Sequence, residues 1–196
     1  MRHIKTAVLL ACCMFQVVAL AQVRAGSPEG ELYDRIAREA NPESKLELVD
    51  SFEKQFPTSK ILPRVYLAAV EVYRQTGNRE KIKEFGEKAL QLDSSNITAM
   101  MILARNYAID SKNIDRALEL AHRALNSAVK MGSEPPPTGY SESQWKDYLR
   151  SNEDAARQIL EYVKAVKGRL ERISATSSTV DTSSVPASSD ASKNTP

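Results

Sequence analysis

The chain has 196 residues, enough for one ordinary domain with tails, and 42% of them are hydrophobic, which is sufficient for a core. This composition excludes a chain that is disordered throughout or embedded in a membrane throughout. The 27 basic and 25 acidic residues nearly balance, so the charge gives no indication of nucleic-acid binding.

Residues 1–21 have the three parts of a secretory signal peptide. Arg2 and Lys5 form a basic start, an apolar run covers 7–20, and Ala19-Leu20-Ala21 is a small-x-small cleavage site. The apolar run is too short to cross roughly 30 Å of hydrocarbon as a helix. We therefore expect cleavage after Ala21, in preference to Ala25, and a mature chain with no membrane span that is exported to the periplasm or secreted.

An alternative processing route is lipid attachment, because Leu9-Leu10-Ala11-Cys12 is similar to a lipobox. In that case Cys12 would carry a lipid and anchor the chain to a membrane. The apolar run continues well past Cys12 and leaves only 7–11 as the hydrophobic region, so cleavage after Ala21 is the favoured interpretation. Cleavage there also removes Cys13, and the mature chain then has no thiol.

After a short linker at 22–28, residues 29–131 contain internal repeats, which is typical of stacked helical units. One set of positions recurs 34 residues later: Tyr66, Ala69, Val70 and Tyr73 correspond to Met100, Leu103, Ala104 and Tyr107. A more divergent copy precedes them. Each copy has apolar residues at helical three-and-four spacing, which predicts about three pairs of amphipathic helices. Small residues in the second helices are expected to let neighbouring helices approach closely.

These repeats resemble the tetratricopeptide repeat. The resemblance is carried by Tyr66, Tyr73, Gly77, Asn78, Ala89 and Leu90 in one copy, and by Leu103, Ala104, Tyr107, Asn113, Ala117, Ala121, Ala124 and Leu125 in the next. The stretch Phe56-Pro57-Thr58-Ser59 also resembles repeats of bacterial envelope proteins, including outer-membrane assembly lipoproteins. The resemblance implies an all-α solenoid of antiparallel helix pairs that holds other proteins.

The rest of the chain divides into a loop, a helix and a tail. Residues 132–140 are rich in Pro and Gly and are predicted to form a loop. A helical stripe over 141–173 predicts one long closing helix, with Ser151 as an alternative second start. Trp145 is expected either to cover the last repeat or to contribute to a partner site. Ser and Thr dominate 174–196, which predicts a disordered tail.

The sequence provides few groups for catalysis. His122 is the one histidine outside the signal peptide, and we expect it to be a solvated helix residue. One histidine without cysteines cannot form a zinc site, and no Gly-rich phosphate loop is present. We expect no catalytic residue, no metal and no cofactor. A hydrolase on a helical scaffold is the competing class, but no acid, base and nucleophile converge in the sequence.

The resemblance implies a concave partner-binding surface lined by the first helix of each pair, which we call the partner face. The partner face would contain basic, acidic and apolar side chains. Such a mixed surface suits a protein or peptide segment that has acidic and apolar groups. An ordinary solvated helix surface is the competing interpretation. Arg105 lies where the family's carboxylate-clamp asparagine is expected, which disfavours recognition of a C-terminal carboxylate. The residues are Arg64, Leu67, Glu71, Arg74, Thr98, Met101 and Arg105, with Ala108 continuing the pattern.

Overall fold

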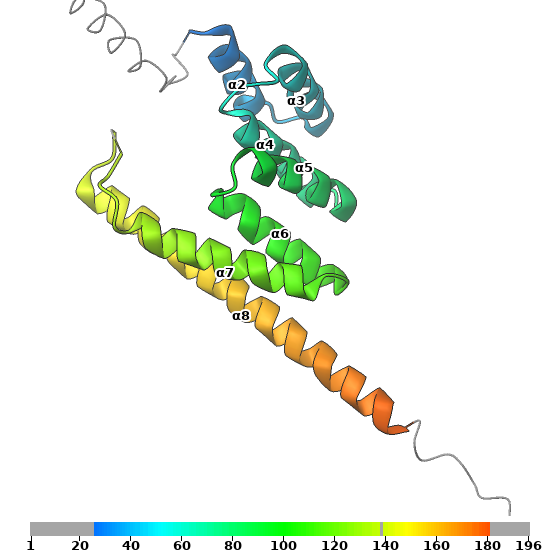
Figure 1. The fold of residues 1–196 in the computed structure, drawn as a ribbon. Coiled ribbons are helices and arrows are strands. Elements are labelled where there is room, and N and C mark those ends of the chain that lie inside the picture. The colour runs from blue at the N-terminus through cyan, green and yellow to red at the C-terminus, as the bar shows by residue number, and fades with distance from the viewer. Residues whose placement is uncertain (1–25, 138, 181–196) are drawn as a thin grey trace, which may run out of the picture. The chain divides into compact units, whose positions relative to one another are not determined.

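The computed structural model describes residues 26–137 and 139–180, and the regular secondary structure of this part of the chain is all α-helical (Figure 1). The all-α prediction is thus confirmed for the described residues. The predicted signal peptide with Cys12 and the part of the predicted tail from 181 onward lie outside them. The helices are α2 (Pro28–Arg38), α3 (Pro42–Gln55), α4 (Leu62–Gln75), α5 (Arg79–Leu92), α6 (Ile97–Asp110), α7 (Ile114–Met131) and α8 (Glu142–Val180).

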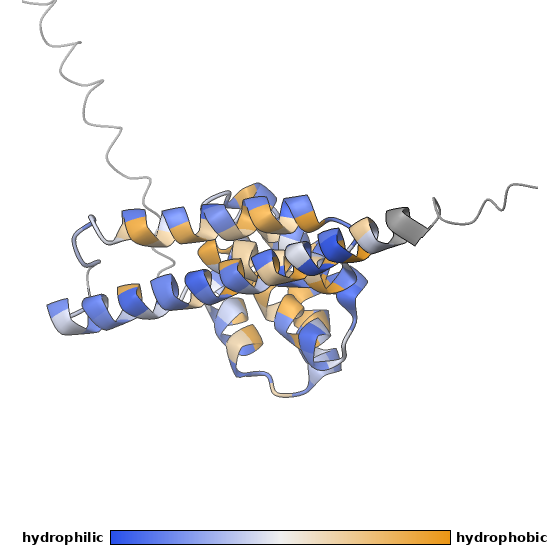
Figure 2. Ribbon diagram, turned by 90° about the horizontal axis from the view of Figure 1, so that it is seen from below, coloured by the Kyte–Doolittle hydropathy of each residue, from blue (hydrophilic) through white to orange (hydrophobic). Residues whose placement is uncertain are grey.

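The starts of the helices before α8 are regularly spaced along the chain. Helices α4 and α6 begin at Leu62 and Ile97, 35 residues apart, and α5 and α7 begin at Arg79 and Ile114, again 35 residues apart. The spacing of helix starts therefore follows the internal repeats of the sequence. Hydrophobic and hydrophilic residues alternate along these helices (Figure 2), as expected of amphipathic helices with one packed side.

Side-chain caps fix where several helices begin. Asn78 Oδ1 accepts a hydrogen bond of 3.1 Å from the Lys81 amide at the start of α5, and Asn96 Oδ1 accepts one of 3.0 Å from the Ala99 amide at the start of α6. These bonds satisfy amide groups that the first turn leaves unpaired. Between α4 and α5, Gly77 has φ +71°, a left-handed conformation that glycine adopts at no steric cost.

The described chain divides into two compact units, one up to Val72 and one from Tyr73 onward. The first unit contains α2, α3 and most of α4. Its core includes Ile36 of α2, Phe52 of α3 and Val65 of α4, all fully buried. The Tyr66 hydroxyl donates a hydrogen bond of 2.9 Å to Glu53 Oε1, so a polar bond joins α3 and α4 beside this core.

The second unit is built around α6, which packs against α5, α7 and α8. Met100 and Leu103 of α6, Leu120 of α7 and Val163 of α8 are fully buried in its core. Helix α8 also packs along α7 and extends past it (Figure 1). A salt bridge of 2.7 Å between Lys167 Nζ and Asp115 Oδ1 joins α8 to the first turn of α7.

Helix α8 differs from the prediction at two places. It begins with a capping box, in which the Gln144 amide donates to Ser141 Oγ and Gln144 Oε1 accepts from the Ser141 amide. It then runs without a break through Ser151, so the alternative second start is wrong. The Asn152 amide side chain donates to the Tyr148 carbonyl within the helix, instead of capping a new start.

The helix also continues beyond 173, where the sequence predicts disorder from 174. Seven more residues are helical, up to Val180. The Ser174 hydroxyl donates to the Glu171 carbonyl at 2.8 Å, and the Thr176 hydroxyl donates to the Arg172 carbonyl at 2.8 Å. These bonds pair the two hydroxyl groups within the helix, so the segment accommodates Ser and Thr without leaving these groups unpaired.

Candidate functional site

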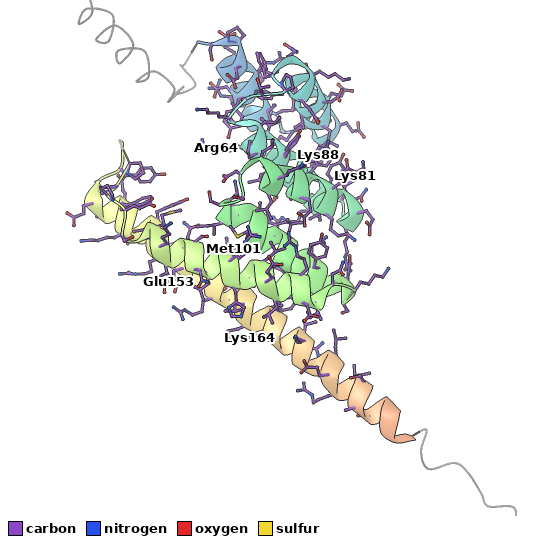
Figure 3. The ribbon with its side chains drawn as sticks, in the orientation of Figure 1. Arg64, Lys81, Lys88, Met101, Glu153 and Lys164 are labelled. Carbon is purple, nitrogen blue, oxygen red and sulfur yellow. The ribbon has the colours of Figure 1, made fainter. Side chains whose placement is uncertain are left out.

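The α4 part of the partner face lies mainly in the first unit. Arg64 and Glu71 are exposed and Leu67 is half-buried, at three- and four-residue spacing on one side of the helix (Figure 3 labels Arg64). Arg74 is also exposed, but it follows the boundary at Val72 and belongs to the second unit. The structure therefore presents these four residues on one helix whose two ends belong to different units.

The α6 part of the partner face lies in the second unit. Thr98 and Arg105 are exposed and Met101 is half-buried, again at three- and four-residue spacing on one helix side (Figure 3 labels Met101). The structure thus brings these three residues together on one surface. A joint surface with the α4 residues of the first unit stays a prediction.

Ala108 does not continue this surface, because it is only 1% exposed. Its place on the exposed side is taken by Ile109, which is 37% exposed. Arg74 stands at the same ten-residue distance from Arg64 and is exposed, so the burial of Ala108 comes from packing, because α5, α7 and α8 all pack against α6. Ile109, eleven residues after Thr98, lies on the same helix side as Thr98. The sequence rule for the second repeat was therefore wrong at this position, and Ile109 adds an aliphatic side chain that it missed.

Ion pairs hold the end of α6 to α5. Asp110 accepts from Arg79 at 3.3 Å and from Lys83 at 3.1 Å, and its side chain is 15% exposed. Partial burial acts to raise the pKa of the Asp110 carboxyl, but the hydrogen bonds from Lys83 and Arg79 outweigh it and hold the pKa below its ordinary value. The orientation of α6, and with it the surface of Thr98, Met101 and Arg105, is fixed partly by these pairs.

Two further polar contacts position α6 and were not anticipated from the sequence. Asn106 is buried, and its side-chain amide donates a hydrogen bond of 3.0 Å to the Arg79 carbonyl at the start of α5. The Tyr107 hydroxyl donates one of 3.0 Å to Glu87 Oε1 of α5. Burial and this bond raise the pKa of Tyr107. The sequence signal for Asn106 was a polar residue on the side of α6 that bears Leu103.

Trp145, in the first turn of α8, is buried and only 7% exposed. Its indole N–H donates a hydrogen bond of 3.3 Å to the Glu134 carbonyl in the loop before α8. This burial agrees with the covering role expected for it, and leaves little of the indole for a partner. His122 is exposed on α7, as expected for a solvated helix residue.

Neither a metal centre nor a membrane-spanning helix is found where the structure describes the chain. No group of three or more His, Cys, Asp or Glu side chains within 26–137 and 139–180 could hold a metal ion. None of the helices in those ranges is sufficiently long and apolar to cross a membrane. The candidate residues are thus two separate sets, one on α4 and one on α6.

Comparison with known proteins gives no assignment: no protein-family model matches the sequence, and no curated protein matches it either. Functional inference rests on the residues themselves.

Proposed function

We propose that this protein is an exported, non-enzymatic scaffold of the tetratricopeptide type, which holds a protein or peptide partner on the partner face. The proposal depends on one observation, that the regular spacing of helix starts coincides with the exposure of the expected side chains. Helices α4 and α6 begin 35 residues apart, and both keep arginine and an apolar side chain exposed or half-buried at the expected positions.

The chemistry of the partner follows from that surface. Arg64, Arg74 and Arg105 favour carboxylate groups, which a guanidinium binds through paired hydrogen bonds. Leu67 and Met101 favour apolar side chains, and methionine adapts its shape to different partners. An extended or helical segment with acidic and apolar residues therefore suits the partner face.

The test is capture of partners by the full exported chain in its native envelope fraction. The double variant Arg74→Glu with Arg105→Glu should lose the captured proteins, because charge reversal repels an acidic segment. A matched control, Arg38→Glu with Arg150→Glu, changes the net charge equally at exposed sites on α2 and α8. Circular dichroism should show that both variants fold. Equal capture by both folded double variants would overturn the use of the partner face.

The alternative is a lipid-anchored accessory of envelope or outer-membrane protein assembly, attached through Cys12. In this alternative the protein would use the same partner face, but the lipid would hold the protein at a membrane. Intact mass and N-terminal sequencing of soluble and detergent fractions separate the two forms. A soluble chain that begins near Gln22 supports the exported scaffold, whereas a lipid-bearing start at Cys12 supports the accessory.

A further inference from the structure

Helix α8 carries a second uncharged surface beside the side that packs in the core. Its packed side includes the buried residues Trp145, Ala156, Leu160, Val163 and Val166. Next to it, uncharged residues recur at alternating spacings of three and four along the exposed helix. We call this surface the tyrosine stripe: Tyr148, Ser151, Ala155, Gln158, Tyr162 and Ala165.

The tyrosine stripe is exposed along its length. Tyr148 is 42% and Tyr162 is 40% exposed, and Ala155 between them is half-buried. Alternating three- and four-residue spacing keeps all six residues within one side of a helix. Such spacing without a charge over five helical turns is the pattern of a helix side that packs against another helix.

The ends and centre of the stripe suit close helix packing. The Tyr148 ring stacks on the buried Trp145 ring, with centroids 5.4 Å apart and an interplanar angle of 17°, so its orientation is fixed before any partner binds. Ala155 lies midway between the two tyrosines. A small side chain at that point lets a second helix approach to within about 8–10 Å between axes.

One edge of the stripe is acidic. Asp147, Asp154 and Glu161 are exposed and recur every seven residues, each next to a stripe residue on the helix surface. Asp147 and Asp154 make no ion pair within the part of α8 that the structure describes. Glu161 is already paired with Lys164 at 3.0 Å, so the unpaired charge of this edge comes from Asp147 and Asp154 (Figure 3 labels Lys164). Arg157 and Lys164 lie beyond the acidic edge, and Arg169 follows the last stripe residue.

We infer that the tyrosine stripe docks an amphipathic helix of another protein, whose contact side is apolar and whose edge carries Lys or Arg residues at seven-residue spacing. Charge complementarity with Asp147 and Asp154 specifies the basic edge. An antiparallel second copy of the stripe would instead bring two acidic edges together, which is unfavourable. This surface is separate from the partner face, so the failure of either proposal leaves the other standing.

The test uses the full mature chain and two labelled synthetic helical peptides. Both have Leu and Ala along one side, and one has Lys along an edge where the other has Glu. Fluorescence anisotropy should show that the Lys peptide binds at least about tenfold more tightly. The double variant Asp147→Lys with Asp154→Lys should reverse this preference.

A second arm separates docking from simple charge attraction. Ala155→Glu should weaken binding of the Lys peptide although it adds an attractive charge, because the larger side chain prevents close approach. Ala175→Glu makes the same change on the opposite side of α8 and should leave binding unchanged, with circular dichroism as the check on folding. Unchanged binding by Ala155→Glu, or equal binding of both peptides, would overturn the inference. So would a dimer of the chain, seen by analytical ultracentrifugation, that Ala155→Glu dissociates.

Discussion

Gly86 of α5 lies against Leu103 of α6 so closely that a Cβ at position 86 would be 2.9 Å from Leu103 Cδ2. Leu103 is fully buried and cannot move away freely. We expect Gly86→Ala to destabilise the protein by about 1 kcal/mol, because overpacking outweighs the gain in helix propensity. Thermal unfolding followed by circular dichroism measures the change.

Gly168 provides the matched control, because it is also a helical glycine but has room. A Cβ there would meet the Arg172 side chain at an ordinary distance of 3.6 Å. Gly168→Ala should therefore raise stability by roughly 0.5–1 kcal/mol through helix propensity alone. If both substitutions stabilise the protein, the close approach of α5 and α6 is wrong.

Ser111 occupies a left-handed backbone conformation, with φ 56°, at the end of α6. Glycine adopts this conformation without strain, so Ser111→Gly should raise the free energy of unfolding by about 0.5 kcal/mol. Chemical denaturation measures the difference. Gly77→Ser makes the reverse change at φ +71° after α4 and should lower stability; a gain in stability there would contradict the account.

The ion pairs of Asp110 should make part of the stability depend on pH. Its pKa is below the ordinary value of 3.8, so its contribution is complete above that pH and is lost as the pH falls through the lower native pKa. Asp110→Asn should cost roughly 1 kcal/mol at pH 7 and progressively less in acid. Urea unfolding of both proteins between pH 7 and pH 2 measures this convergence.

Asp147 is the control for that comparison, because it is exposed and makes no ion pair among the described residues. Asp147→Asn should change stability little at any pH. A loss as large as that of Asp110→Asn would show that the contacts of Asp110 with Lys83 and Arg79 do not contribute.

Deleting residues 141–173 should destabilise the second unit, because α8 contributes Trp145, Leu160 and Val163 to its core. Loss of several buried side chains predicts that the free energy of unfolding falls by at least about 4 kcal/mol and that the melting temperature is much lower.

A milder pair of variants also tests whether α8 contributes to the core. Leu160→Ala should cost about 2–4 kcal/mol, whereas Tyr162→Ala, at a position 40% exposed, should cost less than about 1 kcal/mol.

Periodic features of this fold could be predicted from the sequence, since they depend on local spacing. The helix starts follow the recurrence of Tyr66 and Tyr73 at Met100 and Tyr107, and the turn at Gly77-Asn78 marks a helix end and a cap. Burial of Trp145 was one of the two expectations for this residue, because an aromatic residue after a loop commonly packs at a helix start.

Tertiary features could not be predicted in the same way. The burial of Ala108 and the hydrogen bond of Asn106 to the Arg79 carbonyl both depend on how the neighbouring helices pack against α6. The end of α8 at Val180 was not predicted, because the Ser/Thr-rich composition after 173 indicates disorder. The uncharged tyrosine stripe was visible in the sequence but was obscured by the adjacent core pattern.

The most direct test of the central claim is site-specific photo-crosslinking in the native envelope. A photoreactive amino acid at position 105 on the partner face is compared with one at position 122, an exposed site on α7. The account predicts defined protein adducts from position 105 and none of comparable yield from position 122. Equal adducts from both positions, or adducts from position 122 alone, would contradict a partner held on the partner face.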